Sequence, residues 1–476
     1  MNILRLRDYQ SDLMGRTGAA LRRVRRVLMQ CPPGGGKTAI ATSIANAYAA
    51  QLRQAWFICH RAELIEQTSK TFSKYGLQHG FIAAGYPQSL GALVQICSID
   101  TLKNRLESLV APAVALIDEC HHSGAAGWAM VIQWLTDNGT KIIGLSGTPQ
   151  RHDGAGLDAH FDELVLGPTV AWLMANGHLS QYAIYAPSAP DMAGVKKQFG
   201  EWERGETVKR MRAPKLTGDM IKHWRKLASG MRTVGFAMTV SHSKYMAELF
   251  NAAGIASAHL DGKTPKAERK RIIMDFAEGR IFVIWNVALF GEGFDLAAIA
   301  QIDITIDCII DAAPTRSLSW YLQKIMRPMR PAPGKEAIIL DHAGNSNAHG
   351  YPDDERDWLT TWKGRDKGKK AANDNAPPPP VTCEECFRQI RRPLPECCPG
   401  CGKLLTAAQK AIAVSPEELK RKTDADKKAT KQRLAFEQAQ CESLAELADL
   451  FRKRGHKKPV ERAGIVFGSR RRKQHA

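Results

Sequence analysis

The sequence feature that most constrains the fold is the glycine-rich segment CPPGGGKT, residues 31–38. It follows the apolar run VLMQC and precedes the helix-like run AIATSIANAYA, which is the setting of a phosphate-binding loop. Glycines let backbone N–H groups turn inward on a phosphate, and the helix N-terminus adds positive potential. A chance glycine-rich turn is the alternative, and Cys31 stands where the simple pattern has glycine. We expect the phosphate and Mg²⁺ contacts to come from Gly34, Gly35, Gly36, Lys37 and Thr38.

Two adjacent carboxylates, Asp118 and Glu119, follow the apolar run of another expected strand, VALID. They would lie at the carboxyl edge of a parallel sheet, where ligands bind in such folds. Asp118 can complete the Mg²⁺ shell, and Glu119 can polarise an attacking water. An Asp-Glu pair alone is most often surface charge. Behind a phosphate-binding loop we interpret it, together with Lys37, as catalytic.

The strand pattern predicts two α/β domains, because two long stretches alternate short apolar strands with amphipathic helices. We place the first domain at residues 1–186 and the second at 213–350, with 187–212 as a linker or small insertion. The expected strands are VLMQC, AWFIC, VQICS, VALID and KIIGLS in the first domain, then TVGFAM, ASAHL, IFVIW, QIDITI and EAIILD in the second. Length agrees, since 476 residues suffice for about three domains.

After the second domain the composition changes. Residues 351–382 are charged and then proline-rich, which favours a linker. Residues 383–403 hold the spaced cysteines, and 404–476 form a basic tail that we expect to be helical, above all over 415–454. The last 25 residues carry ten Lys and Arg against a single Glu. A solvated tail and a nucleic-acid contact are equally compatible with such a run.

The net charge indicates the class of partner. Lys and Arg number 67 against 48 Asp and Glu, a net charge of +19. Such an excess favours nucleic acid, because phosphate contacts release counterions; a merely soluble basic protein is the alternative. No uncharged apolar run approaches the roughly 18 residues that span a bilayer, and the N-terminus lacks the apolar core of a secretory signal. We therefore expect a cytoplasmic protein of a bacterial or phage-infected cell, without a membrane partner.

The order of the motifs makes the sequence resemble superfamily 2 helicases of the DEAD/DEAH group, in particular RadD-like and phage or restriction-type (ResIII-like) members. The resemblance covers about residues 4–345. RDYQ looks like the adenine-reading segment, with Gln10 in the adenine role, and CPPGGGKT matches motif I. ICHRAELIEQT and CSIDTL are similar to motifs that touch the nucleic-acid backbone, and DECH is a variant of the DEAH box. LSGTPQRHDGAGL is similar to motif III, in which Ser146 and Thr148 would couple hydrolysis to grip on the strand.

In the second domain, ALFGEGFDLAAI resembles motif V, with Gly293 and Asp295 at its centre, and YLQKIMRPMRPAPGKEAIILDHAGN resembles motif VI. Three polar residues of motif VI have helical spacings of four and three and would share one helix face: Gln323, Arg327 and Arg330. The resemblance implies that both arginines cross the interdomain cleft to the γ-phosphate as arginine fingers. Met326 replaces the usual glycine, and Pro328 follows the first arginine. These departures put the finger geometry in question, since proline interrupts helical hydrogen bonding.

A pair of Cys-x-x-Cys motifs separated by eleven residues suits tetrahedral Zn²⁺, because each pair can supply two thiolates from one tight turn. Cys397 competes with its neighbour Cys398, but only Cys398 restores the spacing. Reduced free thiols are the alternative. We expect a structural or docking zinc ribbon, and a possible protein partner there, with the four ligands Cys383, Cys386, Cys398 and Cys401.

These features together predict two tandem RecA-like domains, a zinc ribbon and a basic helical tail. The resemblance implies an ATP-dependent DNA helicase or translocase, in DNA repair, recombination or phage replication, with ATP, Mg²⁺ and structural Zn²⁺ as cofactors. One alternative is a nucleic-acid-stimulated remodelling ATPase, or an RNA helicase, that does not unwind duplexes. Another is an impaired ATPase that acts as a zinc-dependent binding module. The choice of DNA rests on the resemblance alone.

Overall fold

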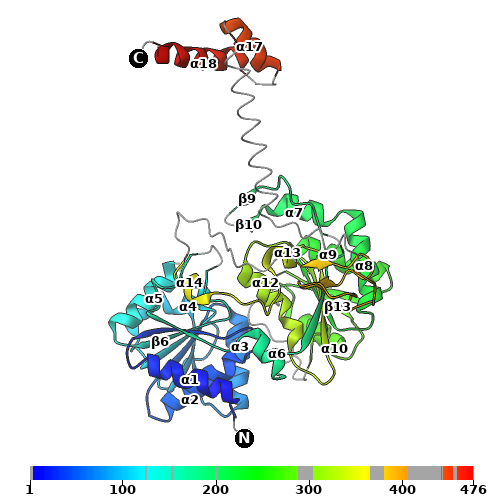
Figure 1. Ribbon diagram of the computed structural model, residues 1–476. Helices are drawn as coiled ribbons and strands as arrows, with labels where there is room; N and C mark the ends of the chain where they lie inside the picture. Colours follow the sequence, from blue (N-terminus) through cyan, green and yellow to red (C-terminus); the bar gives the residue numbers. More distant parts are fainter. Residues whose placement is uncertain are drawn as a thin grey trace. The chain divides into compact units, whose positions relative to one another are not determined.

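The structure of the chain is a computed structural model (Figure 1). It divides into two compact units, Met1–Leu404 and Leu405–Ala476. The residues that it describes are 4–123, 126–151, 155–187, 189–198, 201–287, 304–364, 380–405, 441, 443–453 and 458–474.

Seven parallel strands form the first sheet, in the order β3-β4-β2-β5-β6-β1-β7. Their residues alternate between two cores, since Val27 and Met29 of β1 belong to one buried cluster and Leu28 to the other. Burial on both faces is typical of parallel sheets and explains the continuous apolar runs. The strands are β1 (Arg26–Gln30), β2 (Ala55–Cys59), β3 (Gly80–Ile82), β4 (Val94–Ser98), β5 (Val114–Asp118), β6 (Lys141–Ser146) and β7 (Glu163–Leu166).

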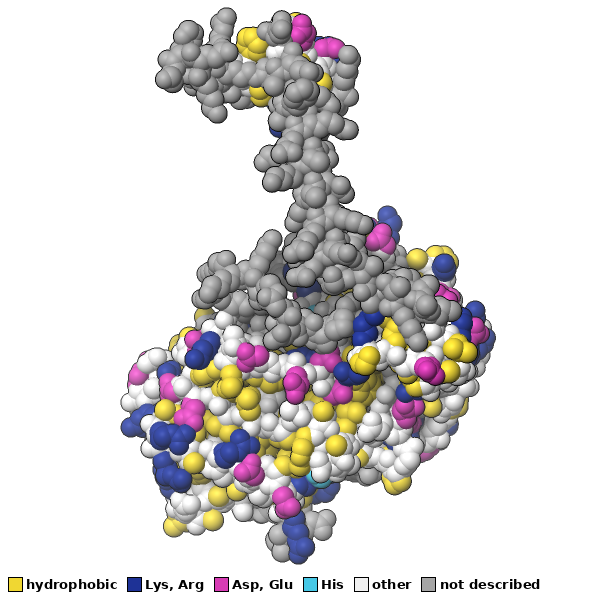
Figure 2. All heavy atoms as spheres, viewed as in Figure 1, with side chains coloured by type: hydrophobic (Ala, Val, Ile, Leu, Met, Phe, Trp, Pro, Cys, Tyr) yellow, Lys and Arg dark blue, Asp and Glu magenta, His cyan; other side chains and the backbone are white. Residues whose placement is uncertain are grey.

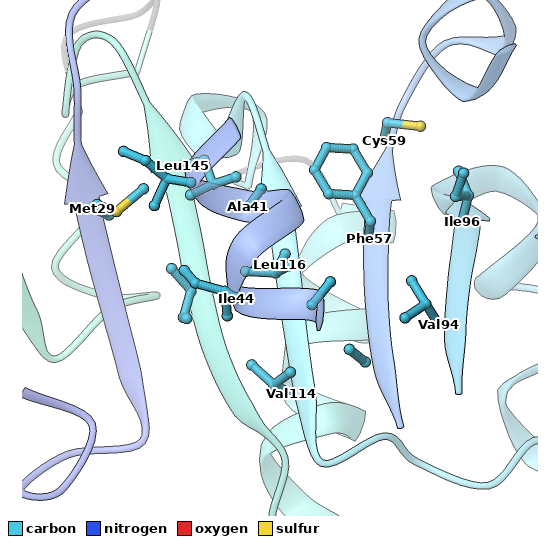
Figure 3. Packing of buried hydrophobic residues seen from close by; sticks show 14 of the residues in the cluster. Met29, Ala41, Ile44, Phe57, Cys59, Val94, Ile96, Val114, Leu116 and Leu145 are labelled. Atoms are coloured by element: carbon cyan, nitrogen blue, oxygen red, sulfur yellow. The ribbon is translucent and has the colours of Figure 1, made fainter. Parts of the chain in front are cut away.

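Helices cover both faces of this sheet (Figure 1). On one face lie α1 (Asp8–Ala20), α2 (Lys37–Ala49) and α3 (Ala62–Lys74), and on the other α4 (Ile99–Leu102) and α5 (Ala126–Asp137). Figure 3 shows Ala41 and Ile44 of α2 packed over the sheet beside Leu116 and Leu145. This packing fixes the start of α2, and with it the phosphate-binding loop, above the carboxyl edge of the sheet.

The second sheet has six parallel strands in the order β12-β13-β11-β14-β15-β8. The strands are β8 (Gln181–Tyr185), β11 (Thr233–Ala237), β12 (Ser257–Leu260), β13 (Val283–Asn286), β14 (Cys308–Ala312) and β15 (Glu336–Asp341). Its first face packs against α7 (Arg204–Met211), α8 (Pro214–Leu227) and α9 (Val240–Ala252), and its second against α10 (Lys266–Ala277) and α12 (Leu318–Ile325). The expected pair of parallel α/β domains is confirmed.

Three details differ from the sequence-based expectations. Strand β8 lies within the range we expected for the first domain, but it pairs with β15 of the second sheet. The short strands β3 and β7 were not expected, and the expected linker 187–212 contains helix α7 and the hairpin β9 (Lys197–Gln198) and β10 (Glu201–Trp202).

The expected strand QIDITI is also wrong in its described part, since the strand begins only at Cys308. Ile304 and Ile306 are buried against the α10 core without ladder pairing. Their alternation therefore reflects packing, which a sequence pattern cannot separate from strand formation.

Helix α6 (Val170–Ala175) lies between β7 and β8 in the chain. After the second sheet come α13 (Asn345–His349), α14 (Trp358–Thr361) and the short antiparallel pair β16 (Val381–Thr382) and β17 (Gln389–Ile390). Trp362, in the expected linker 351–382, is buried in the core of the first domain, and its carbonyl accepts from Leu157 N at 2.7 Å. The described start of this segment is therefore part of the folded unit.

The second unit contains α17 (Leu444–Lys453) and α18 (Pro459–Gln474), which pack on each other through Leu447, Phe451 and Ala463. Helix α17 lies within the helix expected over 415–454, most of which falls outside the described residues. Among the described residues, no helix combines the length and the apolar character needed to cross a membrane.

Candidate active site

The phosphate-binding loop runs from the end of β1 to the first residue of α2, Lys37. Gly34 and Gly36 have left-handed φ angles of 82° and 86°, which favour glycine. A Cβ on Gly35 would lie 2.6 Å from Cys31 Sγ, and one on Gly36 would lie 2.2 Å from Gln10 Nε2. The loop therefore requires its glycines, and the buried Cys31 side chain packs beneath it.

The two carboxylates follow β5, as the sequence predicts. Glu119 is 5% exposed and has φ 46° and ψ 50°, a left-handed conformation that costs a non-glycine residue about 1–3 kcal/mol. Its Oε1 accepts a hydrogen bond from Lys37 Nζ at 2.8 Å. Its backbone N–H donates to Asp118 Oδ1 at 3.0 Å. This tight turn brings both carboxylates to the phosphate-binding loop.

Burial and mutual charge set the protonation of this cluster. Burial, together with the Glu119 carboxylate, raises the pKa of Asp118 to about 6. Burial lowers the pKa of Lys37, but the Glu119 and Asp118 carboxylates outweigh it, so the pKa of Lys37 is raised. Lys37 is therefore charged and offsets the negative charge of the two carboxylates. The hydroxyl of Thr38 and the carboxylate of Asp118 are oxygen donors of the kind that Mg²⁺ prefers, and they fit that ion.

The segment that contains Tyr9 and Gln10 is fixed to the phosphate-binding loop. Gln10 Nε2 donates to Gly35 O at 3.1 Å, and Tyr9 Oη donates to the same carbonyl at 3.0 Å. The sequence reasoning missed two rings beside Tyr9: Trp172 lies 5.7 Å and His178 5.0 Å from its ring centroid. Trp172 is 42% exposed, although aromatic side chains are usually buried. These rings come from α6 and the turn after it, far along the chain, and no local pattern marks them.

The second domain reaches this site through α12. Gln323 Nε2 donates to Glu119 Oε2 at 3.5 Å, and both side chains are buried. Thr148 of motif III donates from Oγ1 to Ser319 Oγ at 2.6 Å. Ser146 Oγ, in turn, donates to Thr148 O at 2.6 Å. The structure thus brings motifs I, III and VI together with the DEAH-box variant that contains Glu119.

The spacing of motif VI predicted that its two arginines share a helix face with Gln323. In the structure they do not. Helix α12 ends at Ile325, and Arg327–Met329 forms a separate 3₁₀ turn. Pro328 explains the difference, because proline cannot continue an α-helix but is tolerated at the start of a turn. Met326 is buried among the apolar side chains between α6 and α12, so it fills space that glycine would leave. Arg327 and Arg330 are half-buried. Gly293 and Asp295 of motif V lie outside the described residues.

The cysteine-rich region, residues 380–405, is called the knuckle below. Four Sγ atoms lie within 4.8 Å of one another, and they belong to Cys383, Cys386, Cys398 and Cys401. The Cys383–Cys401 and Cys386–Cys398 Sγ distances are 3.7 and 3.6 Å, close to the about 3.8 Å edge of a tetrahedron with Zn–S bonds of about 2.3 Å. Cys398 belongs to this cluster of four sulfur atoms, whereas its neighbour Cys397 is exposed.

The electrostatics of the knuckle agree with a metal site. Burial raises the pKa of the Cys383 thiol, but the backbone N–H groups of Cys386 and Glu385, together with the Cys398 and Cys401 thiols, outweigh burial and lower that pKa to about 7. Backbone donors that stabilise a thiolate favour metal ligation, because metals bind the deprotonated sulfur. The four cysteines fit a zinc ribbon.

The comparisons with known proteins match both domains. The protein-family model of the type III restriction enzyme res subunit matches residues 3–151. The protein-family model of the helicase conserved C-terminal domain matches residues 217–332. A 51.5 kDa protein of a Lactococcus phage (isolate 7-9) is 32% identical over 345 residues, which is 72% of either chain. The putative ATP-dependent helicase IRC3 of Saccharomyces cerevisiae is 27% identical over 368 residues; the match covers 72% of this chain and 52% of the yeast protein, about half its length.

A solved structure shares the fold. The ATP-dependent Type ISP restriction-modification enzyme LlaBIII bound to DNA has a TM-score of 0.53 and 17% identity, over 76% of this chain and 29% of that chain. At this identity the likeness concerns the fold, and it agrees with two tandem RecA-like domains.

The Lys37–Glu119 contact yields a prediction. Glu119→Gln should lower the rate of ATP hydrolysis by about 10²–10⁴-fold, the usual contribution of a positioned base. The affinity for ATP should be kept or strengthened. In this variant Lys37 no longer has to separate from the charged Glu119 carboxylate in order to reach the phosphates. Hydrolysis rates and nucleotide affinity, measured by fluorescence titration, check this. The control is Glu107→Gln on the exposed surface of the same domain; hydrolysis that survives in Glu119→Gln would contradict the role.

Proposed function

The chain belongs to the superfamily 2 helicases of the ResIII type, and we propose that it hydrolyses ATP to move along, or unwind, DNA. The observation that carries this proposal is the Glu119 carboxylate, which accepts hydrogen bonds from Lys37 of the first domain and Gln323 of the second. The Glu119 carboxylate, which we propose responds to ATP, is thereby hydrogen-bonded to both domains. Hydrolysis can then open and close the cleft between them.

In the proposed cycle, the ATP phosphates draw Lys37 away from Glu119. The freed carboxylate accepts a hydrogen bond from the attacking water and takes up its proton. Thr38 and Asp118 hold Mg²⁺, which when bound neutralises charge on the β- and γ-phosphates. Gln323 holds the second domain against Glu119. The position of the second domain therefore depends on whether the ATP phosphates are bound or hydrolysed.

Two further sets of residues have proposed roles. Arg327 and Arg330 offset charge on the γ-phosphate, and the turn after α12 presents them from the second domain. Gln10 recognises adenine, and the exposed Trp172 ring beside Tyr9 offers a face on which the base can stack. From the family resemblance we also assign Gly293 and Asp295 of motif V to the nucleotide site.

The proposed track is DNA. The net charge of +19 favours a polyanion, and the LlaBIII enzyme of similar fold is bound to DNA. From the family resemblance we propose a place in DNA repair, recombination or phage replication, and the phage relative is consistent with the cytoplasm of a bacterial or phage-infected cell. We also propose structural Zn²⁺ in the knuckle. The first domain is proposed to end before β8 rather than at residue 186, since β8 pairs with the second sheet.

One prediction concerns the track. ATP hydrolysis by the purified protein should rise on adding single-stranded or duplex DNA more than on adding RNA, and Lys37→Ala should abolish it. Steady-state rates with buffer, each DNA and RNA measure this. Stimulation by RNA alone would show that the track is RNA rather than DNA. No hydrolysis under any condition would favour the binding-module alternative.

A strand-displacement assay separates unwinding from remodelling. A helicase releases a labelled strand in an ATP-dependent way, whereas a remodelling ATPase hydrolyses ATP with equal DNA stimulation but displaces only bound protein. This result decides between the two candidates without changing the assignment of the ATP site.

The basic tail yields another prediction. On the face shown in Figure 2, the described Lys and Arg side chains of the first unit are interspersed with Asp and Glu, whereas the last 25 residues hold ten basic residues and one acidic. Deleting residues 452–476 should flatten the salt dependence of DNA binding, by about 0.9 in slope for each phosphate that the tail neutralises. Binding titrations over a range of salt measure the slope, and an unchanged slope would contradict a tail contact with DNA.

A further inference from the structure

The knuckle packs on the edge of the second sheet. Ala186 N, directly after the edge strand β8, donates to Phe387 O at 3.0 Å, and Tyr185 and Arg388 form an antiparallel bridge. Arg388 also pairs with Glu336 of β15 at 3.0 Å. Edge strands present unpaired backbone groups, so the knuckle covers backbone that the sheet itself leaves unpaired.

Arg391 fixes the knuckle from a second side. Its guanidinium lies 3.9 Å from the centroid of the Tyr351 ring and donates to Asp354 Oδ1 at 2.6 Å. It also donates to Tyr182 Oη at 3.0 Å and pairs with Asp353. A planar guanidinium that stacks on a ring while binding two carboxylates is held in one orientation. The knuckle is therefore anchored to β8 and to the segment after α13.

A third contact leads inward through α13. Gln389 Nε2 donates to Asn347 Oδ1 at 2.9 Å. Two residues earlier in the same short helix, Asn345 Nδ2 donates to Asp311 Oδ2 at 2.8 Å, and Asn345 Oδ1 accepts from Thr315 N at 2.9 Å. Thr315 belongs to the loop that leads into α12. One helix thus contacts both the knuckle and the base of motif VI.

The inward end of this path is a buried ion pair. Lys324 Nζ donates to Asp311 Oδ1 at 2.6 Å and to Ala313 O at 2.9 Å, and the side chains of Lys324 and Asp311 are fully buried. Lys324 follows Gln323, which reaches Glu119. Because a buried charge must keep its partner, the position of Asp311 restricts the rotation of α12. Asn345 holds the other oxygen of Asp311.

From this continuous set of contacts we propose that the zinc-holding knuckle braces α12, and that Gln389 and Arg391 are positioning residues for ATP hydrolysis. The inference rests on the proposed ATPase function and extends it. Zn²⁺ fixes the knuckle, the knuckle fixes α13 through Gln389 and the Tyr351 segment through Arg391, and α13 fixes Asp311 beneath Lys324. The metal therefore acts on hydrolysis from outside the ATP site. A knuckle that serves as a separate docking or DNA-binding module is the other outcome.

The test uses the full chain and the double variant Gln389→Ala/Arg391→Ala, which keeps all four cysteines. We expect one Zn²⁺ per chain by metal analysis, unchanged affinity for ATP, and a DNA-stimulated kcat lowered by about 2- to 30-fold, the range of coupling found along packed networks. Hydrogen–deuterium exchange of α12 and α13 should become faster. Arg391→Lys with Gln389 intact should recover part of kcat.

The matched control is Lys403→Ala, which removes a knuckle charge paired only loosely with the exposed Glu384, at 3.7 Å. It should leave zinc content, exchange and kcat as in the parent protein. Cys383→Ser/Cys386→Ser, or removal of zinc with a chelator, should speed exchange in α12 and α13 as the double variant does. An unchanged kcat and unchanged exchange in a double variant that retains zinc would overturn the brace.

The exchange measurement separates this proposal from the proposed function. If the parent protein hydrolyses no ATP, the proposed function fails, but exchange in α12 and α13 on zinc removal still tests the brace. Unchanged exchange on zinc removal, with hydrolysis intact, would overturn the brace and leave the ATPase assignment standing.

Discussion

The Glu119 carboxylate lies between the two domains, and its two oxygens accept hydrogen bonds from Lys37 on one side and Gln323 on the other. Its backbone is held in a left-handed conformation that an ordinary residue avoids. Strain of this kind persists only where the surrounding structure fixes it, as the packed β5 and the turn after it do here. A single carboxylate therefore contacts both the lysine of the phosphate-binding loop and the second domain.

The rest of the first unit keeps α12 in position for this contact. From one side, Thr148 of motif III bonds to Ser319. From below, the buried Lys324–Asp311 pair fixes the helix to the second sheet. Polar groups in a low-dielectric interior are costly unless every partner is present. The helix consequently has few alternative positions, and its contact with the Glu119 carboxylate is held in place.

Local signals made much of this predictable. Continuous apolar runs indicated most strands, because parallel strands are buried on both faces, and the glycines with Lys37 located the phosphate-binding loop. Contacts between distant segments were not predictable: Trp172 stands beside Tyr9 through tertiary packing alone. The helix face that the spacing of motif VI predicted was wrong, because Pro328 ends the helix. The knuckle's cysteines were legible as a metal site, but its attachment to β8 depends on Arg391 and Gln389, which carry no motif.

The most direct test of the shared site is single-turnover ATP hydrolysis by Gln323→Ala, compared with Gln133→Ala on the exposed side of α5. A hydrogen bond to a charged group contributes about 1.5–3 kcal/mol. We predict that Gln323→Ala binds ATP normally and hydrolyses it at least about tenfold more slowly, with DNA stimulation reduced, while Gln133→Ala behaves as the parent protein. Unchanged single-turnover hydrolysis in Gln323→Ala would contradict the claim that the site is built from both domains.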